Sequence, residues 1–390
     1  MGRGPAYRRR GRPRRTTLGR SRPDERVRAA RPRPHTATKG WIMSASTASA
    51  SPGTLRAAQV SEPGGTPELA QVAAREPGPG SVRITVEACG VCHSDLLIAS
   101  GALPGTTFPL TPGHEIAGRI DTLGENVTGW QVGDRVAVGW YGGSCGHCDA
   151  CRSGDAVMCP ELAIPGVAYP GGYADSVVVP AVALAAIPDE LTAVEAAPLA
   201  CAGVTVFNAL RHTTAGPGDT VAVLGLGGLG HLGVQFAQKM GFDTVAIARG
   251  QEKKDLAHKL GAAHYIDSTT EEVAEALQAL GGAKVVLATV TNATAMSATI
   301  DGLGRRGELA IVGISPEPLQ VNGLQLLRGA RKVYAHASGA AVDTQDTLRF
   351  AARSGVRAWT EEVPLEETAA AVEKMTNGQA RFRMVLTTGH

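Results

Sequence analysis

Short apolar runs alternate with amphipathic segments over residues 220–335 of this 390-residue chain. The apolar runs are rich in Val, Ile and Ala and predict buried strands. We expect these strands at residues 220–224, 244–248, 264–266, 284–290, 308–313 and 332–335. Between them apolar residues recur with a helical period, for example over 252–260 and 271–280. Strands and helices that alternate at this spacing predict an α/β fold with a doubly wound parallel sheet.

A glycine-rich turn, Gly225-Leu-Gly227-Gly228-Leu229-Gly230, follows the first of these strands and leads into a helix. Gly225 permits the tight turn, Gly227 lets a pyrophosphate approach the backbone, and Gly230 lets the helix pack closely on the strand. The N-terminus of the helix offers unpaired N–H groups to an anion. This order of strand, turn and helix predicts a dinucleotide-binding Rossmann domain.

The end of the second strand bears on the choice between NAD and NADP. Sheets that bind NAD usually place Asp or Glu there to bind the ribose, whereas this chain has Ala248 followed by Arg249. Arginine can bind a 2′-phosphate through two hydrogen bonds, and Lys253 adds positive charge nearby. The pattern favours NADP over NAD. The alternative is that Arg249 is a solvated loop cation and that either cofactor is used.

Four of the seven cysteines lie within fifteen residues, in the order Cys145-x₂-Cys148-x₂-Cys151-x₇-Cys159. Four thiolates at this spacing can surround one tetrahedral ion, which is the pattern of structural zinc. Paired disulfides are the alternative, but the spacing suits a metal better and the chain shows no secretory signal. We therefore expect a closed zinc site in this lobe.

A second set of possible ligands, Cys92, His114 and Cys201, is scattered along the chain. Three protein ligands leave a fourth position for water or substrate, which is the pattern of catalytic zinc. Considered alone, a lone His or Cys more often packs as an ordinary core or surface residue. Only the fold can bring these three side chains together.

From about Leu55 to the C-terminus the chain resembles the zinc-containing medium-chain alcohol dehydrogenases, on the yeast-type and cinnamyl-alcohol-type side. The resemblance rests on motifs in the order of that family: Gly90-Val-Cys92-His93-Ser94-Asp95, Pro112-Gly-His114-Glu115, Val132-Gly-Asp-Arg-Val136, the four-cysteine lobe, Gly171-Gly-Tyr-Ala174, Leu199-Ala-Cys201-Ala-Gly-Val-Thr205 and Gly225–Gly230. It implies a GroES-like, β-rich catalytic domain at 50–197, a Rossmann domain at 198–337 and a return to the catalytic domain at 338–390.

The resemblance also implies two zinc ions per chain, with Cys92, His114 and Cys201 as the ligands of the catalytic ion. Asp95 would orient the ring of His114, as ligating histidines generally require. Glu115 resembles the acidic residue behind the zinc that can assist ligand exchange, although a plain salt bridge is the alternative.

The same resemblance places further side chains around substrate and cofactor. Ser94 would bind the substrate oxygen and relay its proton. The expected cofactor contacts are His93 and Arg383 at the pyrophosphate, Thr205 at the nicotinamide, and also Leu229 and Val290. Trp140 would line the substrate pocket, with packing under the zinc lobe as the alternative. Yeast-type relatives carry a His where this chain has Leu97, so we expect proton transfer beyond Ser94 to pass through the cofactor ribose and water.

The predicted function is zinc-dependent hydride transfer between NAD(P) and a primary alcohol or aldehyde, aliphatic or aromatic. A polyol or another hydroxylated metabolite is the alternative substrate. A non-catalytic, zinc-containing nucleic-acid binder is a second alternative, against which the intact open-site residues and Ser94 argue. Because members of the resembled family form dimers or tetramers, we expect a homo-oligomer with a small-molecule substrate and with neither a nucleic-acid nor a membrane partner.

The N-terminal 42 residues differ from the rest of the chain. They carry a net charge of +12, so the total of +2 leaves the remainder at −10. The stretch is rich in Arg, Pro and Gly and predicts disorder. We expect it to be sequence upstream of a true start at Met43; a nucleic-acid-binding or targeting arm is the alternative. We expect no apolar run long enough to span a bilayer, and thiol-only metal ligation suits the cytoplasm.

Overall fold

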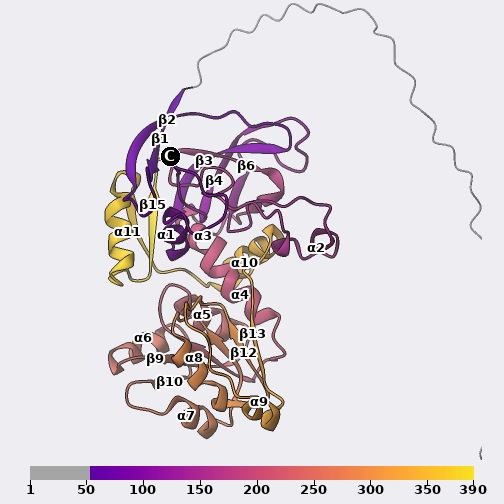
Figure 1. Ribbon diagram of the computed structural model, residues 1–390, viewed down its shortest axis with the longest axis vertical. Helices are drawn as coiled ribbons and strands as arrows, with labels where there is room; N and C mark the ends of the chain where they lie inside the picture. The colour runs from indigo at the N-terminus through magenta and orange to yellow at the C-terminus, as the bar shows by residue number, and fades with distance from the viewer. Residues whose placement is uncertain (1–52) are drawn as a thin grey trace, which may run out of the picture. The chain divides into compact units, whose positions relative to one another are not determined.

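A six-stranded parallel sheet occupies residues 220–335 of the computed structural model, which describes residues 53–390 (Figure 1). The strand order is β10-β9-β8-β11-β12-β13. The strands are β8 (Thr220–Leu224), β9 (Asp243–Ala248), β10 (His264–Asp267), β11 (Ala283–Ala288), β12 (Leu303–Ile311) and β13 (Lys332–Ala335). The chain order reverses between β8 and β11, so the carboxyl ends of these two strands form the crevice where such sheets bind nucleotides. The predicted α/β fold is confirmed.

Both faces of this sheet are covered. Val221, Val285 and Leu287 pack with Leu232 and Phe236 of α5 in one apolar cluster, whereas alternate positions of the same strands face a second cluster. The helical elements of this region are α4 (Val204–Arg211), α5 (Gly230–Lys239), η4 (Gln251–Lys253), α6 (Lys254–Lys259), α7 (Val273–Ala279), α8 (Ala293–Ala298), η5 (Ile300–Gly302) and α9 (Gly323–Gly329). Burial on two faces explains why the strands are continuous apolar runs.

A second, mostly antiparallel sheet has the order β14-β15-β3-β4-β5-β7, and β6 also pairs with β3. Its strands are β3 (Ser81–Gly90), β4 (Ile116–Leu123), β5 (Arg135–Val138), β6 (Ser176–Pro180), β7 (Ala185–Ala186), β14 (Thr360–Pro364) and β15 (Arg383–Thr387); β1 (Thr54–Gln59) and β2 (Glu68–Ala73) form a separate ribbon. The C-terminal strand β15 pairs with β3, nearly three hundred residues earlier. The described residues, 53–390, belong to one compact unit, so the expected boundaries at 50–197, 198–337 and 338–390 stay predictions.

Helical segments connect or cover this second sheet. They are α1 (His93–Ala99), α2 (Asp149–Arg152), η1 (Ala156–Met158), η2 (Ala181–Ala183), α3 (Ala193–Pro198), η3 (Leu199–Gly203), α10 (Ala341–Ser354), η6 (Leu365–Glu367) and α11 (Thr368–Thr376). Thr192 caps α3, because its hydroxyl accepts a hydrogen bond from the Glu195 amide while the Glu195 carboxylate binds the Thr192 amide. The π-helical turn η3 follows directly and carries Cys201.

The segments α3, η3 and α4 form one helix, Ala193–Arg211, with a mean hydropathy of 1.5. By length and composition it could cross a membrane, so the expectation that no stretch reaches this length is wrong. In its most apolar 18-residue stretch 78% of the residues are buried among the described residues, and the helix belongs to the core cluster that contains Leu199, Val206 and Leu210. A core helix passes the same test of length and hydropathy.

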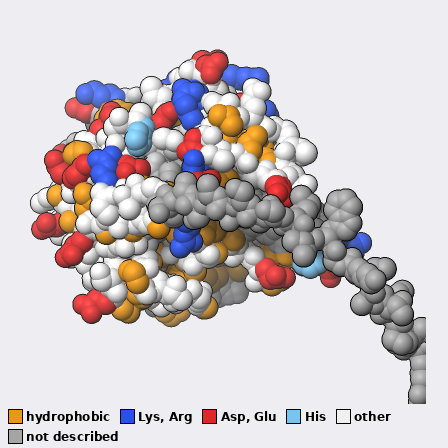
Figure 2. All heavy atoms as spheres, turned by 90° about the horizontal axis from the view of Figure 1, so that it is seen from above, with side chains coloured by type: hydrophobic (Ala, Val, Ile, Leu, Met, Phe, Trp, Pro, Cys, Tyr) orange, Lys and Arg blue, Asp and Glu red, His pale blue; other side chains and the backbone are white. Residues whose placement is uncertain are grey.

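Charged side chains of both signs are interspersed on the uncovered part of the face shown in Figure 2. They are not gathered there into a separate basic area and a separate acidic area. The predictions made for residues 1–42 lie outside the described residues.

Candidate active site

Four potential ligands converge between the two sheets: Cys92, His114, Glu115 and Cys201, whose ligand atoms all lie within 4.8 Å of one another. Cys92 is the N-cap of α1, His114 and Glu115 immediately precede β4, and Cys201 lies in η3. The fold therefore brings together the three residues that the sequence scattered. Nε2 of His114 lies 3.2 Å from Sγ of Cys201. Two thiols, one imidazole and one carboxylate form a donor set that suits zinc.

The Cys92 thiol is acidic in this environment. A hydrogen bond from Cys201 lowers the pKa of Cys92 well below its ordinary value, and the neighbouring His114 contributes further lowering against the effect of burial. A thiolate is the form that ligates metals. The arrangement thus favours the metal-binding state of Cys92.

The ring of His114 is held by the buried carboxylate of Asp95. Nδ1 of His114 lies 2.7 Å from Oδ1 of Asp95, which also accepts a hydrogen bond from the Gly113 amide, while Oδ2 of Asp95 accepts one from the Cys92 amide. The hydroxyl of Tyr173 donates to Asp95 Oδ2 at 2.9 Å. This network turns Nε2 of His114 toward the other ligands. The motif Gly171–Ala174 includes Tyr173, but the sequence did not predict its contact with Asp95.

Glu115 forms a buried ion pair with Arg383, the first residue of β15. The pair leaves Oε2 of Glu115 and Nε of Arg383 buried without hydrogen-bond partners among the described residues. Burial raises the pKa of Glu115 to about 7, although the charge of Arg383 acts in the opposite direction. Unpaired buried polar atoms are costly, so both atoms are suited to groups that arrive with a metal or an anion.

The guanidinium of Arg383 also lies against the glycine-rich turn. A Cβ atom at Gly228 would stand 2.8 Å from Nη1 of Arg383, and one at Gly230 would stand 1.8 Å from the carbonyl oxygen of Gly225. Gly225 has a φ of +101°, whereas Gly227 has open space where a side chain would be. The turn therefore has the tight bend, the close packing and the exposed backbone that an approaching pyrophosphate requires.

Two further expected cofactor contacts lie at the same turn. Leu229 is the N-cap of α5 and is half-buried. Val290 follows β11, and its Cγ1 would stand 2.7 Å from a Cβ at Gly225. Thr205 lies half-buried in the first turn of α4.

The residues after β9 include carboxylates as well as cations. Arg249 is exposed and Lys253 is half-buried in η4. The Glu252 carboxylate folds over Gly250, where a Cβ would stand 2.1 Å from its Oε2. Asp267, at the end of β10, accepts a hydrogen bond from the Gly250 amide at 2.8 Å, and hydrogen bonds from Thr269 lower its pKa to about 2. The sequence interpretation considered the cations and missed both carboxylates.

The four lobe cysteines Cys145, Cys148, Cys151 and Cys159 also bring their sulfurs within 4.8 Å of one another. Cys159 Sγ lies 3.6 Å from Cys145 Sγ and 3.8 Å from Cys148 Sγ. Zn–S bonds of about 2.3 Å in a tetrahedron would separate the sulfurs by about 3.8 Å. All seven cysteines are free thiols. The distances fit a metal rather than disulfides.

Three expected site residues lie near the open ligand set: His93 and Ser94 in the short helix α1, and Trp140 two residues after strand β5. His93 is exposed and Ser94 half-buried in the first turn of α1, directly after Cys92. The Trp140 ring stands edge-on to the His114 ring, with centroids 5.1 Å apart and an interplanar angle of 89°. Trp140 also packs against an apolar cluster that contains Ile98 and Leu110. Trp140 therefore both contacts a candidate ligand and packs in the apolar core.

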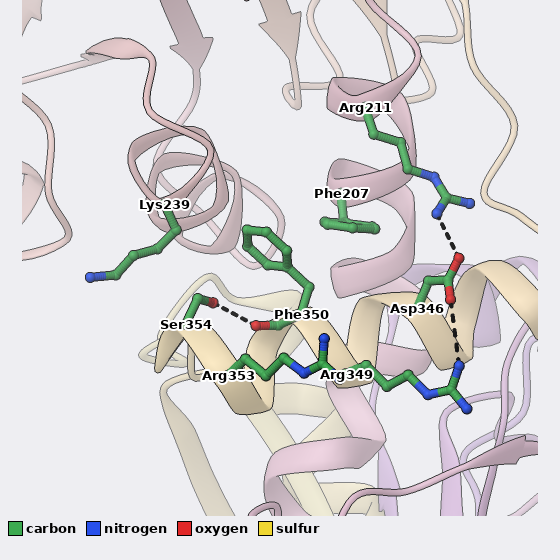
Figure 3. Close-up of a pocket in the computed structure, with 8 residues that line it drawn as sticks. All are labelled: Phe207, Arg211, Lys239, Asp346, Arg349, Phe350, Arg353 and Ser354. Atoms are coloured by element: carbon green, nitrogen blue, oxygen red, sulfur yellow. Dashed lines mark hydrogen bonds and ion pairs between the residues drawn. The ribbon is translucent and has the colours of Figure 1, made fainter. Parts of the chain in front are cut away.

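A groove of about 580 Å³ lies elsewhere, between α4, α5 and α10 (Figure 3). Arg211 and Asp346 form an ion pair across it, and Lys239 extends away from the other cations. None of the candidate site residues lines this groove. It does not contribute to the site.

Comparisons with known proteins agree with this geometry. Residues 78–189 match the family described as "Alcohol dehydrogenase GroES-like domain", and residues 228–353 match "Zinc-binding dehydrogenase". "Alcohol dehydrogenase patD" of Penicillium expansum is 42% identical over 340 residues, which cover 87% of this chain and 99% of that protein. "Aldehyde reductase AdhA" of Synechocystis is 34% identical over 310 residues, which cover 80% and 92% of the two chains.

Solved structures are similar over the same range. A cinnamyl alcohol dehydrogenase from Sorghum bicolor is 30% identical with a TM-score of 0.79, over 86% of this chain and 97% of that chain. A Helicobacter pylori structure titled as CAD complexed with NADP(H) is 26% identical with a TM-score of 0.77, over 86% and 98%. The activity is zinc-dependent oxidoreduction of alcohols and aldehydes. The chain belongs to the zinc-containing medium-chain alcohol dehydrogenase family.

Proposed function

We propose that this enzyme transfers a hydride between NADP and a primary alcohol or its aldehyde, with an aliphatic or aromatic side chain. The observation that carries the proposal is the convergence of Cys92, His114, Glu115 and Cys201 beside Arg383 and the glycine-rich turn. The proposed metal site would thus lie beside the proposed phosphate-binding turn, as hydride transfer from a metal-activated oxygen compound requires.

Cys92, His114 and Cys201 would hold a catalytic zinc ion, and the four-cysteine lobe would hold a second, structural one. A bound zinc ion would act as a Lewis acid on the substrate oxygen, and a bound nicotinamide would exchange the hydride. One carboxylate oxygen of Glu115 lies within 4.8 Å of the other ligand atoms, and its Oε2 has no hydrogen-bond partner among the described residues, so Glu115 would serve as an exchangeable fourth ligand. Asp95 would keep Nε2 of His114 available by holding Nδ1.

Ser94 would accept the proton of the alcohol hydroxyl and return it during aldehyde reduction. Its position in the first turn of α1, two residues after Cys92, supports this role. Leu97, one turn later, has no group that can carry the proton further. Trp140 beside His114 would supply an apolar wall, which favours an alkyl or aryl substrate over a polyol.

Arg249 would bind the 2′-phosphate of NADP, with Lys253 nearby. His93, Arg383 and the backbone amides of the glycine-rich turn would bind the pyrophosphate, and Thr205 would contact the nicotinamide. Relatives of known structure include one titled as complexed with NADP(H) and one, an acetophenone reductase from Geotrichum candidum, titled as complexed with NAD. Because relatives are complexed with either cofactor, the proposed preference for NADP rests on the cations Arg249 and Lys253 after β9.

The proposal is tested by kcat/KM for benzaldehyde reduction with NADPH and with NADH, on protein shown to hold two zinc ions. We expect activity with both cofactors and a higher kcat/KM with NADPH. A zinc-loaded sample that fails with both cofactors on benzaldehyde and on ethanol oxidation would contradict the substrate class. A polyol panel would then follow.

Replacing Arg249 by alanine should raise the KM for NADPH on the order of tenfold, because one charge-assisted hydrogen-bond partner of the phosphate is lost. The KM for NADH should change by less than about twofold, since that cofactor has no 2′-phosphate. Arg353→Ala, an exposed arginine on α10 away from the site, is the matched control. Equal effects on both cofactors would show that Arg249 does not distinguish them.

We also propose a homo-oligomer in the cytoplasm. β13 is one of the two edge strands of the parallel sheet, and the nearby side chains of Ile314 and Leu327 are 75% and 78% exposed. An open strand edge beside exposed apolar side chains suits an interface between copies. The free thiols of both ligand sets suit a reducing compartment.

A further inference from the structure

His231, the first residue after Gly230 in α5, is buried and links the glycine-rich turn to a distant segment. Its Nε2 lies 3.2 Å from the Trp359 amide, which can only donate, so Nε2 accepts. Nδ1 must then carry the proton, and it donates to the carbonyl oxygen of Gly227 at 3.1 Å. Burial lowers the pKa of His231 to about 3, so the ring stays neutral and keeps its acceptor.

Gln235, one turn later in α5, binds the same segment. Its Oε1 accepts from the Arg357 amide at 3.2 Å, and its Nε2 donates to the Arg357 carbonyl oxygen at 2.9 Å. Residues 356–359 belong to no strand, so these two side chains supply backbone hydrogen bonds that a neighbouring strand would otherwise supply. We call His231 and Gln235 the α5 clamp.

The segment held by the clamp leads to Arg383. The carbonyl oxygen of Trp359 accepts from the amides of Phe382 and Arg383, each at 3.0 Å. The Phe382 ring stacks on the His231 ring, with centroids 4.8 Å apart and an interplanar angle of 20°. The Arg383 guanidinium returns to the glycine-rich turn beside Gly228. A continuous path of contacts therefore leads from the glycine-rich turn through His231, Trp359 and Arg383 back to the same turn.

We propose that the α5 clamp positions Arg383 against the glycine-rich turn and thereby sets the affinity for the dinucleotide phosphates. This inference rests on the proposed function, in which both Arg383 and the turn amides bind the pyrophosphate. Ordering a mobile side chain when a ligand binds costs free energy and lowers the affinity. A side chain that is already held in its binding position avoids this cost. His231 and Gln235 touch neither substrate nor reacting atoms in this scheme, so they are positioning residues.

Three substitutions of His231 separate its contacts. The side-chain carbonyl oxygen of Gln can take the position of Nε2 and keep the hydrogen bond from the Trp359 amide. The shorter Asn side chain reaches only the position of Nδ1 and loses that hydrogen bond. Phe keeps the stacking on Phe382 and loses both hydrogen bonds. The Kd for NADPH and NADH, measured from the fluorescence of the bound dihydronicotinamide, should rise on the order of tenfold in His231→Asn and His231→Phe. In His231→Gln it should stay within about threefold of the wild type.

Gln235 provides an independent test with a matched control on the same helix. Gln235→Ala should raise the cofactor Kd several-fold. Gln238→Ala, at an exposed position three residues later in the same helix, should not change the Kd. The zinc content should stay at two ions per chain in each variant. A merely structural role would lower the active fraction and kcat without changing the Kd of the remaining folded protein.

The outcomes distinguish this inference from the proposed function. If the wild type binds neither NADPH nor NADH, the proposed function fails. If the wild type binds cofactor but the Asn, Phe and Gln235→Ala variants bind it equally well, the clamp is overturned alone. Should His231→Phe fail to fold, the comparison of His231→Asn with His231→Gln and of Gln235→Ala with Gln238→Ala still decides the inference.

Discussion

Replacing His114 by alanine should lower kcat/KM about a thousandfold or more and reduce the zinc content from two ions per chain to one. The substitution removes one of three side chains that converge on the proposed catalytic ion. Lewis-acid activation supplies several kcal/mol of transition-state stabilisation, and each 1.4 kcal/mol corresponds to about a tenfold change in rate. Steady-state kinetics with benzaldehyde and elemental analysis of the purified protein measure the two effects.

Two control variants separate this effect from general damage. Cys151→Ala in the lobe should also remove one zinc ion and lower the melting temperature, but the remaining folded protein should retain activity within about tenfold, since the open ligand set is intact. Cys89→Ala removes a buried thiol that belongs to neither ligand set. It should keep both zinc ions. A His114→Ala variant with two zinc ions and full turnover would exclude His114 as a ligand.

The parallel sheet was predictable because its strands are buried on both faces and therefore appear as continuous apolar runs. The predicted strand boundaries shifted at the edge of the sheet: β11 ends at Ala288, which pairs with the last residues of both neighbouring strands, Leu224 of β8 and Ile311 of β12. The second sheet had no comparable signal. Its strand β7 has two residues, and β15 pairs with β3 over a separation that no local pattern encodes.

The two ligand sets also differed in how far the sequence could predict them. The lobe cysteines are neighbours in sequence, so spacing alone indicated their convergence. Cys92, His114 and Cys201 come from three elements, and only the family resemblance brought them together before the structure did. The contact between Tyr173 and Asp95 spans 78 residues and was missed for this reason. Glu252 lies between Arg249 and Lys253 in sequence, but no local pattern predicts that its carboxylate folds back over Gly250.

Replacing Arg383 by leucine should destabilise the protein by about 3–5 kcal/mol, because it leaves the buried carboxylate of Glu115 without its cation. Urea denaturation of the zinc-loaded protein measures this loss. The cofactor Kd of the fraction that remains folded should also rise, since the guanidinium beside Gly228 is lost. Arg381→Leu, an exposed arginine two residues earlier, is the matched control and should change stability little.

The double variant Glu115→Gln/Arg383→Leu separates the two roles of this arginine. An uncharged amide removes most of the cost of burying an unpaired carboxylate, so the double variant should be more stable than Arg383→Leu alone. Its cofactor Kd should stay as high as in the single variant, because no cation then faces the glycine-rich turn. If the two variants are equally unstable, the ion pair is not the source of the loss. If the double variant regains cofactor affinity, Arg383 acts on the cofactor only through Glu115.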